Sequence, residues 1–244
     1  MPTPESFLRL RGFAPLPWEE VLQRIERQLG PEFAPVFARL HRAFVAYPVE
    51  HTCKAFYDFV ARHQLLDLLG CHRFDRMVLL AASLEMNVPS GARVLDYGAG
   101  GGVLAQWLRE TKQASISALD LSPAVSAGLA AKGFSPPLAG ETFDVLLCAD
   151  SLGEIHADED DWLSDPENAV DDGFGGELEA RYGFAHKLAD LKTWLAPQGT
   201  VLLFEPVTQA HFWRGAAAVL ETADWQVEVL GPAPVWGLRL QQQG

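Results

Sequence analysis

The stretch VLDYGAGGGVLAQWL, residues 94–108, decides the fold. It joins an apolar run to an acid, then to four glycines within five positions, and then to apolar residues at helical spacing. This order predicts a buried strand, a sharp turn and a helix. Glycine lets the backbone turn tightly and approach a ligand, and the N-terminus of the helix offers unpaired N–H groups. The stretch therefore predicts a loop that binds a nucleotide-like ligand.

A second acid indicates that this ligand contains a ribose. Segment 115–121, SISALDL, has the pattern of the next strand, and Asp120 near its end follows Gly98 by 22 residues. A carboxylate at the end of this strand accepts hydrogen bonds from ribose hydroxyls in dinucleotide-binding folds. The loop and the acid together predict a site outside the carboxyl ends of parallel strands.

Strand and helix patterns alternate from residue 92 onward. Strands are predicted at 92–97, 115–121, 143–150, 199–207, 225–231 and 235–242, with a very short one at Phe134, and helices at 102–112, 123–133, 178–195 and 212–223. Such alternation predicts an α/β, Rossmann-like, doubly wound fold. We expect a mostly parallel seven-stranded sheet whose last strand is antiparallel.

The N-terminal part has helical patterns and no strand pattern. Helices are predicted at 17–29, 33–47, 50–69 and 74–86. We therefore expect residues 1–90 to form a helical cap that shapes a substrate region, and residues 91–244 to form the cofactor-binding domain.

Composition limits the classes of partner. The formal net charge is −13, so the chain as a whole repels phosphate backbones and a nucleic-acid partner is unlikely. The three cysteines are an odd number at irregular spacing, which favours reduced thiols in the cytoplasm and no metal site. No segment is long and apolar enough to predict a signal core or a membrane span.

The glycine spacing alone leaves two cofactor classes open. Counted from Gly100, the pattern G-x-G-x-x-A is present, which allows a nicotinamide cofactor and an oxidoreductase. Asp96, two residues before the first glycine, argues for the other class. Its charge would repel a pyrophosphate but attract an α-amino group and a sulfonium.

LDYGAGGG at 95–102, followed by LDLSP at 119–123, resembles motifs I and II of class I S-adenosylmethionine-dependent methyltransferases. The resemblance covers roughly residues 90–243 and includes the strand FDVLLCAD. It implies S-adenosylmethionine as the cofactor and a methyltransferase activity. The cofactor-binding residues that it implies are Asp96, Tyr97, Gly98, Ala99, Gly100, Gly102, Asp120, Leu121, Ala149 and Asp150.

Within this resemblance, Asp96 and the backbone around Gly98 would hold the methionine part, and Asp120 the ribose. Leu121 would pack on the adenine, while Ala149 and Asp150 would line the mouth where the methyl group is transferred. The chain departs from the family pattern at residues 134–142, where neither the usual third strand nor the acid that meets the adenine amino group is recognisable.

The end of strand 143–150 carries the candidate catalytic residues, which are Asp150, Glu154 and His156. His156 could serve as the general base for a hydroxyl or thiol acceptor, or be a solvated loop histidine. The tetrad N-P-P-Y or D-P-P-Y of adenine and amide-nitrogen methylases is absent. We therefore expect a small molecule or a protein side chain as the methyl acceptor. The acidic segment 156–180 is either a solvated loop or a lid.

Two further hypotheses remain open. LGEI at 152–155 and the stretch 202–221 resemble methyltransferase-like proteins of the small ribosomal subunit, although this chain lacks their cysteine cluster. The chain could thus be a non-catalytic cofactor-binding protein or a ribosome-assembly factor that keeps the methyltransferase fold.

Overall fold

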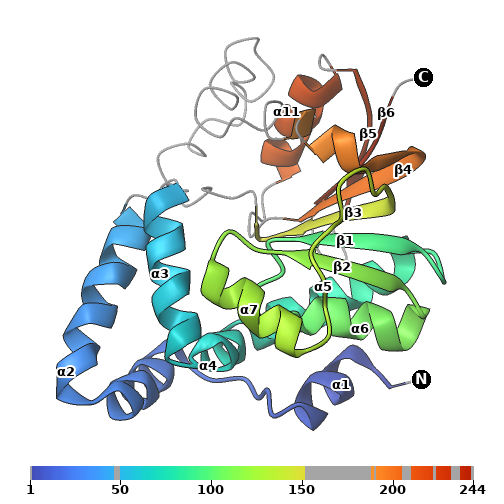
Figure 1. Cartoon of the computed structure of the whole chain (residues 1–244). Helices are drawn as coiled ribbons and strands as arrows, with labels where there is room; N and C mark the ends of the chain where they lie inside the picture. Colours follow the sequence, from blue (N-terminus) through green and yellow to red (C-terminus); the bar gives the residue numbers. More distant parts are fainter. Residues whose placement is uncertain are drawn as a thin grey trace.

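The computed structural model describes residues 2–46, 50–151, 188–189, 191–204, 210–221, 224–231 and 237–242. A twisted sheet has α5 and α6 on one face and α11 on the other, while α2, α3 and α4 lie to one side of it (Figure 1). Within these residues, no helix combines the length and the apolar character needed to cross a bilayer.

The sheet follows the strand order β2-β1-β3-β4-β6-β5. Its strands are β1 (Arg93–Tyr97), β2 (Ser115–Leu119), β3 (Phe143–Ala149), β4 (Leu195–Phe204), β5 (Trp225–Leu230) and β6 (Gly237–Gln242). The first four strands pair in parallel, and β6 pairs antiparallel with both β4 and β5. This confirms the predicted doubly wound, mostly parallel sheet with an antiparallel last strand.

The described sheet has six strands rather than the predicted seven. The short strand expected at Phe134 is a single parallel bridge between Ser117 and Ser135. Pro136 and Pro137 follow directly, and proline has no N–H group to donate to a strand ladder. The edge strand therefore cannot extend beyond one residue pair.

Alternate strand residues build the two cores. Val145 and Leu147 of β3 belong to a core with α5 (Phe74–Asn87) and α6 (Val103–Lys112). Leu146 and Cys148 belong to a second core with α11 (Ala210–Glu221). Because both faces of β3 are covered, its sequence is continuously apolar, as expected for a central parallel strand.

The helices before the sheet largely follow the predicted pattern. The two predicted at 17–29 and 33–47 form α2 (Trp18–Ala46), which is interrupted at Gly30 with φ 67°. The one predicted at 50–69 is divided into α3 (Glu50–Arg62) and α4 (Leu66–His72). The division occurs at Gln64, which has φ 58°, and the N–H of Leu65 bonds to the carbonyl of Val60. This left-handed helix ending is usual for glycine, so glutamine gave no sequence signal for it.

An additional short helix, α1 (Pro4–Leu10), precedes them and was not predicted. Thr3 is its N-cap, because the Thr3 hydroxyl accepts a hydrogen bond from the N–H of Ser6 at 3.2 Å. Phe7 is buried against Trp107 of α6 with ring centroids 5.0 Å apart. Thus α1 packs on the sheet domain although it lies at the start of the chain.

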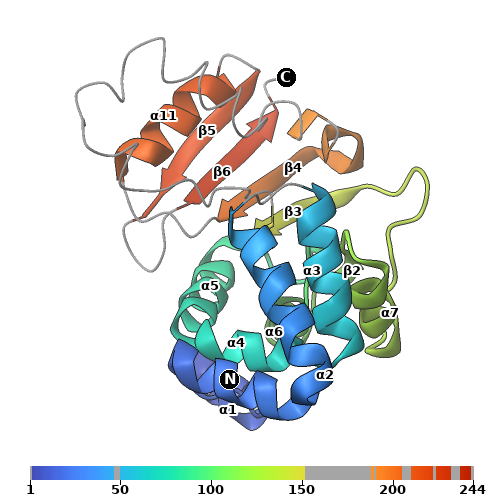
Figure 2. The ribbon, with the colours of Figure 1, turned by 90° about the vertical axis from the view of Figure 1, so that its left-hand side faces the viewer.

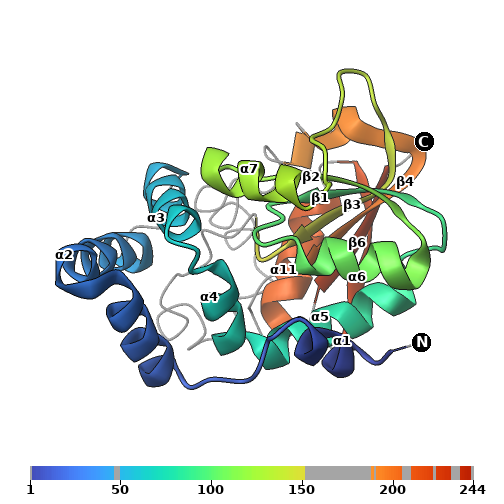
Figure 3. The same cartoon turned by 60° about the horizontal axis from the view of Figure 1, so that its bottom comes forward.

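Helices α2–α4 have an apolar core of their own, which includes Ile25, Phe37, Phe56 and Val60. We call these three helices the cap. Figure 2 shows α2 and α3 in front of the strands, and Figure 3 shows α3 beside α7 (Pro123–Ala131). In contrast, α1 and α5 share a core with the sheet. The domain boundary near residue 90 stays a prediction.

The helix predicted immediately before β4 needs a correction. The helix predicted at 178–195 lies mostly outside the described residues, but its last turn is a 3₁₀ helix at Lys192–Trp194, and Leu195 already pairs with Phe143 in the sheet. The apolar residues of this turn fit either pattern, because one turn of helix and the start of a buried strand both place apolar side chains in the core.

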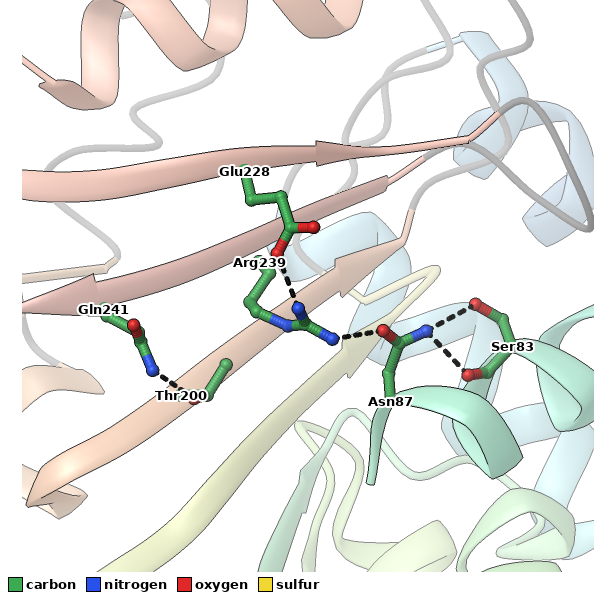
Figure 4. Close-up of polar contacts among 6 residues, drawn as sticks. All are labelled: Ser83, Asn87, Thr200, Glu228, Arg239 and Gln241. Carbon is green, nitrogen blue, oxygen red and sulfur yellow. Dashed lines mark hydrogen bonds and ion pairs between the residues drawn. The ribbon is translucent and has the colours of Figure 1, made fainter. Parts of the chain in front are cut away.

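A polar network connects the last two strands, β5 and β6, to α5 (Figure 4). Arg239 of β6 donates to Glu228 of β5 at 2.5 Å and to the side-chain oxygen of Asn87 at the end of α5. The Asn87 amide in turn donates to the Ser83 carbonyl at 2.8 Å. The network therefore links β5, β6 and α5 through one guanidinium.

We predict that Arg239→Met lowers the free energy of unfolding by about 1 kcal/mol, because the half-buried Asn87 oxygen loses its donor. Urea denaturation measures this. Gln241→Met is the matched control on the same strand. The one side-chain bond that Gln241 makes within the described residues is an exposed bond of 3.3 Å to Thr200, and its loss should change stability by less than about 0.5 kcal/mol. Equal losses in the two variants would contradict the role given to Arg239.

Candidate cofactor and methyl-transfer site

The glycine loop between β1 and α6 uses left-handed backbone at every second residue. The φ angles are 76° at Gly98, 51° at Gly100 and 73° at Gly102. The N–H groups of Gly98 and Ala99 donate to the carbonyl of Leu119 at 2.8 and 3.1 Å, which holds the loop against the end of β2. Gly102 is the N-cap of α6 and provides no capping side chain, so the first N–H groups of α6 stay open to a ligand.

Two of these glycines differ in what surrounds them. A Cβ atom on Gly98 would lie 2.2 Å from the Cβ of Ser151, so this glycine allows the loop after β3 to approach the loop after β1. A Cβ atom on Gly100 would meet nothing within 4 Å, so the loop has an open side there. The glycine loop thus joins two strand ends and leaves free space at its middle.

Asp120 connects this loop to α7. One oxygen of its carboxylate accepts from the N–H of Gly100 at 3.0 Å, and the other accepts from the N–H of Ser122 at 2.9 Å. Burial raises the pKa of Asp120, and the charge of Asp58 adds to this, whereas the two backbone hydrogen bonds oppose it. Each oxygen keeps a lone pair, so the carboxylate can also accept from the hydroxyls of a ribose.

Asp96 is a buried acid without a cation. It is the fourth residue of β1 and is 3% exposed, and within the described part of the chain its carboxylate has no hydrogen bond or ion pair. Burial raises its pKa to about 7, with a further contribution from the charge of Asp120. A buried carboxylate of this kind is stabilised by an ammonium group placed beside it.

The remaining predicted cofactor residues lie around the same strand ends. Leu121 follows Asp120 and is 46% exposed, so it offers apolar surface to a ligand. Ala149 ends β3, next to Tyr97 and the end of β1 in the sheet order. Tyr97 packs toward the α11 core, with its ring 6.4 Å from that of Trp194. The structure therefore places these residues together at the carboxyl ends of the strands. Their roles in binding stay predictions.

Asp150 pairs with two arginines that the sequence analysis did not single out. Its carboxylate lies 2.6 Å from Nη2 of Arg76 and 3.6 Å from Nη1 of Arg73. Asp150 has φ 54°, and its N–H donates to the Phe204 carbonyl at 2.7 Å, which turns the chain away from β3. The two arginines are three residues apart at the start of α5, a spacing that places side chains on one helix face. This three-residue spacing was the sequence signal from which the pair of arginines could have been found.

The cap reaches the site through Asp58 of α3. The Asp58 carboxylate accepts from the Ser122 hydroxyl and from the N–H of Ala124 at 3.3 Å, so it caps the N-terminus of α7 from another helix. No sequence pattern marked Asp58, because its partners are distant in the chain. The neighbouring Tyr57 packs against both the cap core and the cluster below the glycine loop. Burial raises the pKa of Tyr57; the charge of Arg73 lowers it, and those of Asp120 and Asp150 raise it further.

The two other predicted catalytic residues, Glu154 and His156, lie outside the described residues, as does the acidic segment 156–180. Their proposed roles stay predictions. Of the three candidate catalytic residues, the structure places Asp150 alone.

A sequence model described as a methyltransferase domain matches residues 71–231, which is well over half of the chain. The chain belongs to this methyltransferase domain family. The matched region extends from the end of α4 to the end of β5 and includes Asp96, the glycine loop, Asp120 and Asp150. The fold is that of the class I S-adenosylmethionine-dependent methyltransferases, and S-adenosylmethionine is the cofactor of the family. Membership decides against the nicotinamide-dependent oxidoreductase that the G-x-G-x-x-A spacing had left open.

Individual relatives are distant. The mitochondrial ubiquinone biosynthesis O-methyltransferase of Schizosaccharomyces pombe is 29% identical over 123 residues, which cover 44% of this chain and 44% of that protein. The match thus spans less than half the length of this relative. Among solved structures, the pyocyanin biosynthetic protein PhzM has a TM-score of 0.50 at 12% identity, covering 72% of this chain and 58% of that one. A methyltransferase of Bacteroides fragilis in complex with S-adenosylhomocysteine has a TM-score of 0.46 at 17% identity, covering 69% and 78%.

The residues present fit this cofactor. Asp96 is a buried acid that needs a cation, the middle of the glycine loop is open, and Asp120 presents its carboxylate beside that opening. In addition, the Ser151 hydroxyl is buried and has no hydrogen-bond partner among the described residues. A ligand with an ammonium group, a ribose and further polar atoms would satisfy each of these groups.

We predict that S-adenosylhomocysteine binds about tenfold more weakly at pH 6 than at pH 8. The cofactor ammonium requires ionised Asp96, and because the pKa of free Asp96 is about 7, a proton must be removed below that pH. Isothermal titration calorimetry measures the affinity. Asp96→Asn should bind weakly and with little pH dependence; binding as tight as that of the wild type at pH 8 would contradict the assignment.

The same residue should affect the stability of the cofactor-free protein. Because the pKa of Asp96 is higher in the folded state than in the unfolded state, the group favours folding below about pH 4, and this contribution is lost as the pH rises to about 7. We therefore expect the melting temperature of Asp96→Asn, relative to the wild type, to rise between pH 5 and pH 8. A constant difference between the two melting curves would argue against a buried, uncompensated charge.

We predict that Asp58→Ala lowers the free energy of unfolding by about 1–2 kcal/mol, because the buried Ser122 hydroxyl and the start of α7 lose their acceptor. Asp58→Asn is the matched control, since it keeps an acceptor oxygen and loses only the charge at the helix N-terminus, and it should lose less. Chemical denaturation compares the three proteins. If alanine and asparagine destabilise equally, the charge and not the hydrogen bonds joins the cap to α7.

Proposed function

We propose that the protein transfers the methyl group of S-adenosylmethionine to a hydroxyl oxygen of a small molecule. The observation that carries the proposal is the position of the cap. Asp58 caps α7 immediately beside Asp120, and a Cβ atom on Gly101 of the loop would lie 3.8 Å from Asp67 of α4. The cap therefore approaches the carboxyl ends of β1 and β2, where the cofactor residues gather. A site between a cap and strand ends suits a small acceptor that can be enclosed.

The hydroxyl acceptor is supported by the relative from Schizosaccharomyces pombe, whose name describes an O-methyltransferase. The expected acceptor of this chain otherwise includes protein side chains. The position of the cap supports the small molecule, because Asp58 and Asp67 of the cap approach the strand ends where the cofactor residues gather.

The chemistry divides between the cofactor and the chain. When bound, the cofactor would supply a methyl group on a positively charged sulfur, and S-adenosylhomocysteine would leave as the acceptor oxygen takes that methyl group. The chain aligns the acceptor and excludes water, and a base removes the hydroxyl proton. We assign the base to His156, with Glu154 as an orienting group. Asp150 is better suited to positioning than to proton removal, because both of its oxygens already face guanidinium groups.

A second candidate is a non-catalytic protein that binds the cofactor. The observation that favours it is the edge of the sheet, where the usual third strand is reduced to the bridge between Ser117 and Ser135. Such a protein would bind S-adenosylmethionine and S-adenosylhomocysteine without turnover. A role in ribosome assembly belongs to the same candidate and stays a prediction.

The test combines binding and turnover. We expect Asp120→Asn to weaken S-adenosylhomocysteine binding at least tenfold, because one charged acceptor for the ribose is lost while the shape of the side chain is kept. We expect His156→Ala to lower kcat for methylation of a phenol panel, followed with isotope-labelled cofactor, without changing the affinity for S-adenosylhomocysteine. Tight binding with no methylated product across phenols, thiols and amines would favour the non-catalytic candidate. Unchanged binding by Asp120→Asn would contradict the cofactor site itself.

A further inference from the structure

Tyr57 of α3 lies where the cap meets the cofactor site. Its ring packs against Phe44 and Phe56 of the cap core, with centroid distances of 5.6 and 5.3 Å. It also packs against the apolar cluster that α7 forms below the glycine loop, as Ala99 of that loop does. The aromatic part of Tyr57 is therefore held in place from both sides of the boundary between the cap and the sheet domain.

The hydroxyl group of Tyr57 is not used by this packing. Tyr57 is only partly buried, and among the described residues its hydroxyl makes no hydrogen bond. A phenol hydroxyl both donates and accepts, and in the interior of a protein it usually has a partner. The Tyr57 hydroxyl therefore keeps its donor and its lone pairs available to a ligand.

Charged groups from both halves of the site act on this hydroxyl. Burial raises the pKa of Tyr57 most; the charge of Arg73 lowers it, and those of Asp120 and Asp150 raise it further. Asp58, the next residue of α3, caps α7 and so holds this turn of the cap beside Asp120. Asp120 is the predicted ribose acid, and Asp150 lines the predicted mouth for methyl transfer. The Tyr57 hydroxyl therefore lies near both, and the sulfur of the cofactor is the atom bonded to both the ribose carbon and the methyl group.

A neutral phenol is chemically suited to a place beside a methylated, positively charged sulfur. Its oxygen lone pairs stabilise a nearby positive charge. An ionised carboxylate would attract the charge more strongly, but it is also a nucleophile that can take the methyl group itself. Because burial raises the pKa of Tyr57, its hydroxyl keeps its proton at neutral pH and is a weak nucleophile. It can thus stabilise the charge without attacking the methyl group.

We propose that the Tyr57 hydroxyl contacts the methylated sulfur of S-adenosylmethionine and makes the site prefer this cofactor over S-adenosylhomocysteine, whose sulfur is neutral. The inference rests on the proposed function in one respect, which is that S-adenosylmethionine binds with its methyl group at this mouth. It gives the cap a second role beside that of shaping the acceptor region. One side chain of α3 distinguishes the cofactor from the product, which favours release of the product after transfer.

The test compares two ligands that differ at the sulfur. Isothermal titration calorimetry at pH 8, without an acceptor, measures the affinities for S-adenosylmethionine and S-adenosylhomocysteine in wild type and Tyr57→Phe. The substitution keeps the packed ring and removes only the oxygen. We expect Tyr57→Phe to weaken S-adenosylmethionine at least about threefold and S-adenosylhomocysteine less than about twofold, because only the first ligand has the charge that the oxygen stabilises.

Phe59→Leu is the matched control on the same helix. Phe59 packs against the cap core and lies against His63, with ring centroids 4.3 Å apart. Its loss loosens the packing of the cap without removing a polar atom or a charge. We therefore expect Phe59→Leu to change both affinities by the same factor. Melting curves of the three proteins show whether each variant is folded, as expected for changes that keep an apolar side chain in the cap.

The proposal is overturned if Tyr57→Phe leaves the ratio of the two affinities as it is in the wild type, whether both change or neither does. Weaker binding of a phenol acceptor at an unchanged ratio also overturns it, since the hydroxyl would then contact the acceptor. Failure of the proposed function is distinct. Wild-type protein that binds both ligands but methylates no hydroxyl compound contradicts that function, while the ratio still tests Tyr57. Wild-type protein that binds neither ligand overturns both.

Discussion

The two hydrogen bonds that Asp120 accepts determine the geometry of the site. They come from Gly100 in the loop after β1 and from Ser122 at the start of α7, so one carboxylate fixes the distance between the ends of two neighbouring strands. The Ser122 hydroxyl in turn donates a hydrogen bond to Asp58 in the cap. A side chain placed to accept from a ligand is thus also the point at which the glycine loop, the sheet and the cap meet. Ligand binding and cap position are expected to be energetically coupled through it.

The site concentrates acids that the described part of the fold does not neutralise. Among the residues that the structure describes, no cation pairs with Asp96 or with Asp120, which has only backbone donors, and the positive charges of Arg73 and Arg76 lie around Asp150. Such an arrangement lowers the stability of the free protein. A ligand that brings the missing charges restores this stability when it binds. The acids and the arginines occupy different places along the carboxyl ends of the strands. This arrangement suits a ligand that has a cation at one place and an anion at another, as an amino acid does.

Most of the fold could be predicted because its strands and helices have distinct periodicities. The continuous apolar run of β3 and the glycines after β1 indicated a parallel sheet, and the motifs around Asp96 and Asp120 indicated the cofactor site. The features that were missed depend on contacts between distant residues. Nothing local marks Asp58 as the cap of another helix, and nothing local marks Gln64 as the residue that ends α3. The loss of the usual third strand was predicted from residues 134–142, and Pro136 and Pro137 explain why even the very short strand expected there is a single bridge, because proline has no N–H group to donate.

The raised pKa of the buried Asp96 carboxyl has a consequence for how binding is observed. At pH 7 about half of the free molecules hold a proton on this carboxylate, because its pKa is about 7. A ligand that brings its own ammonium group displaces that proton into the solvent. The heat of binding will therefore include the heat of protonating the buffer, and it will differ between buffers of high and low ionisation enthalpy even though the affinity at that pH is the same.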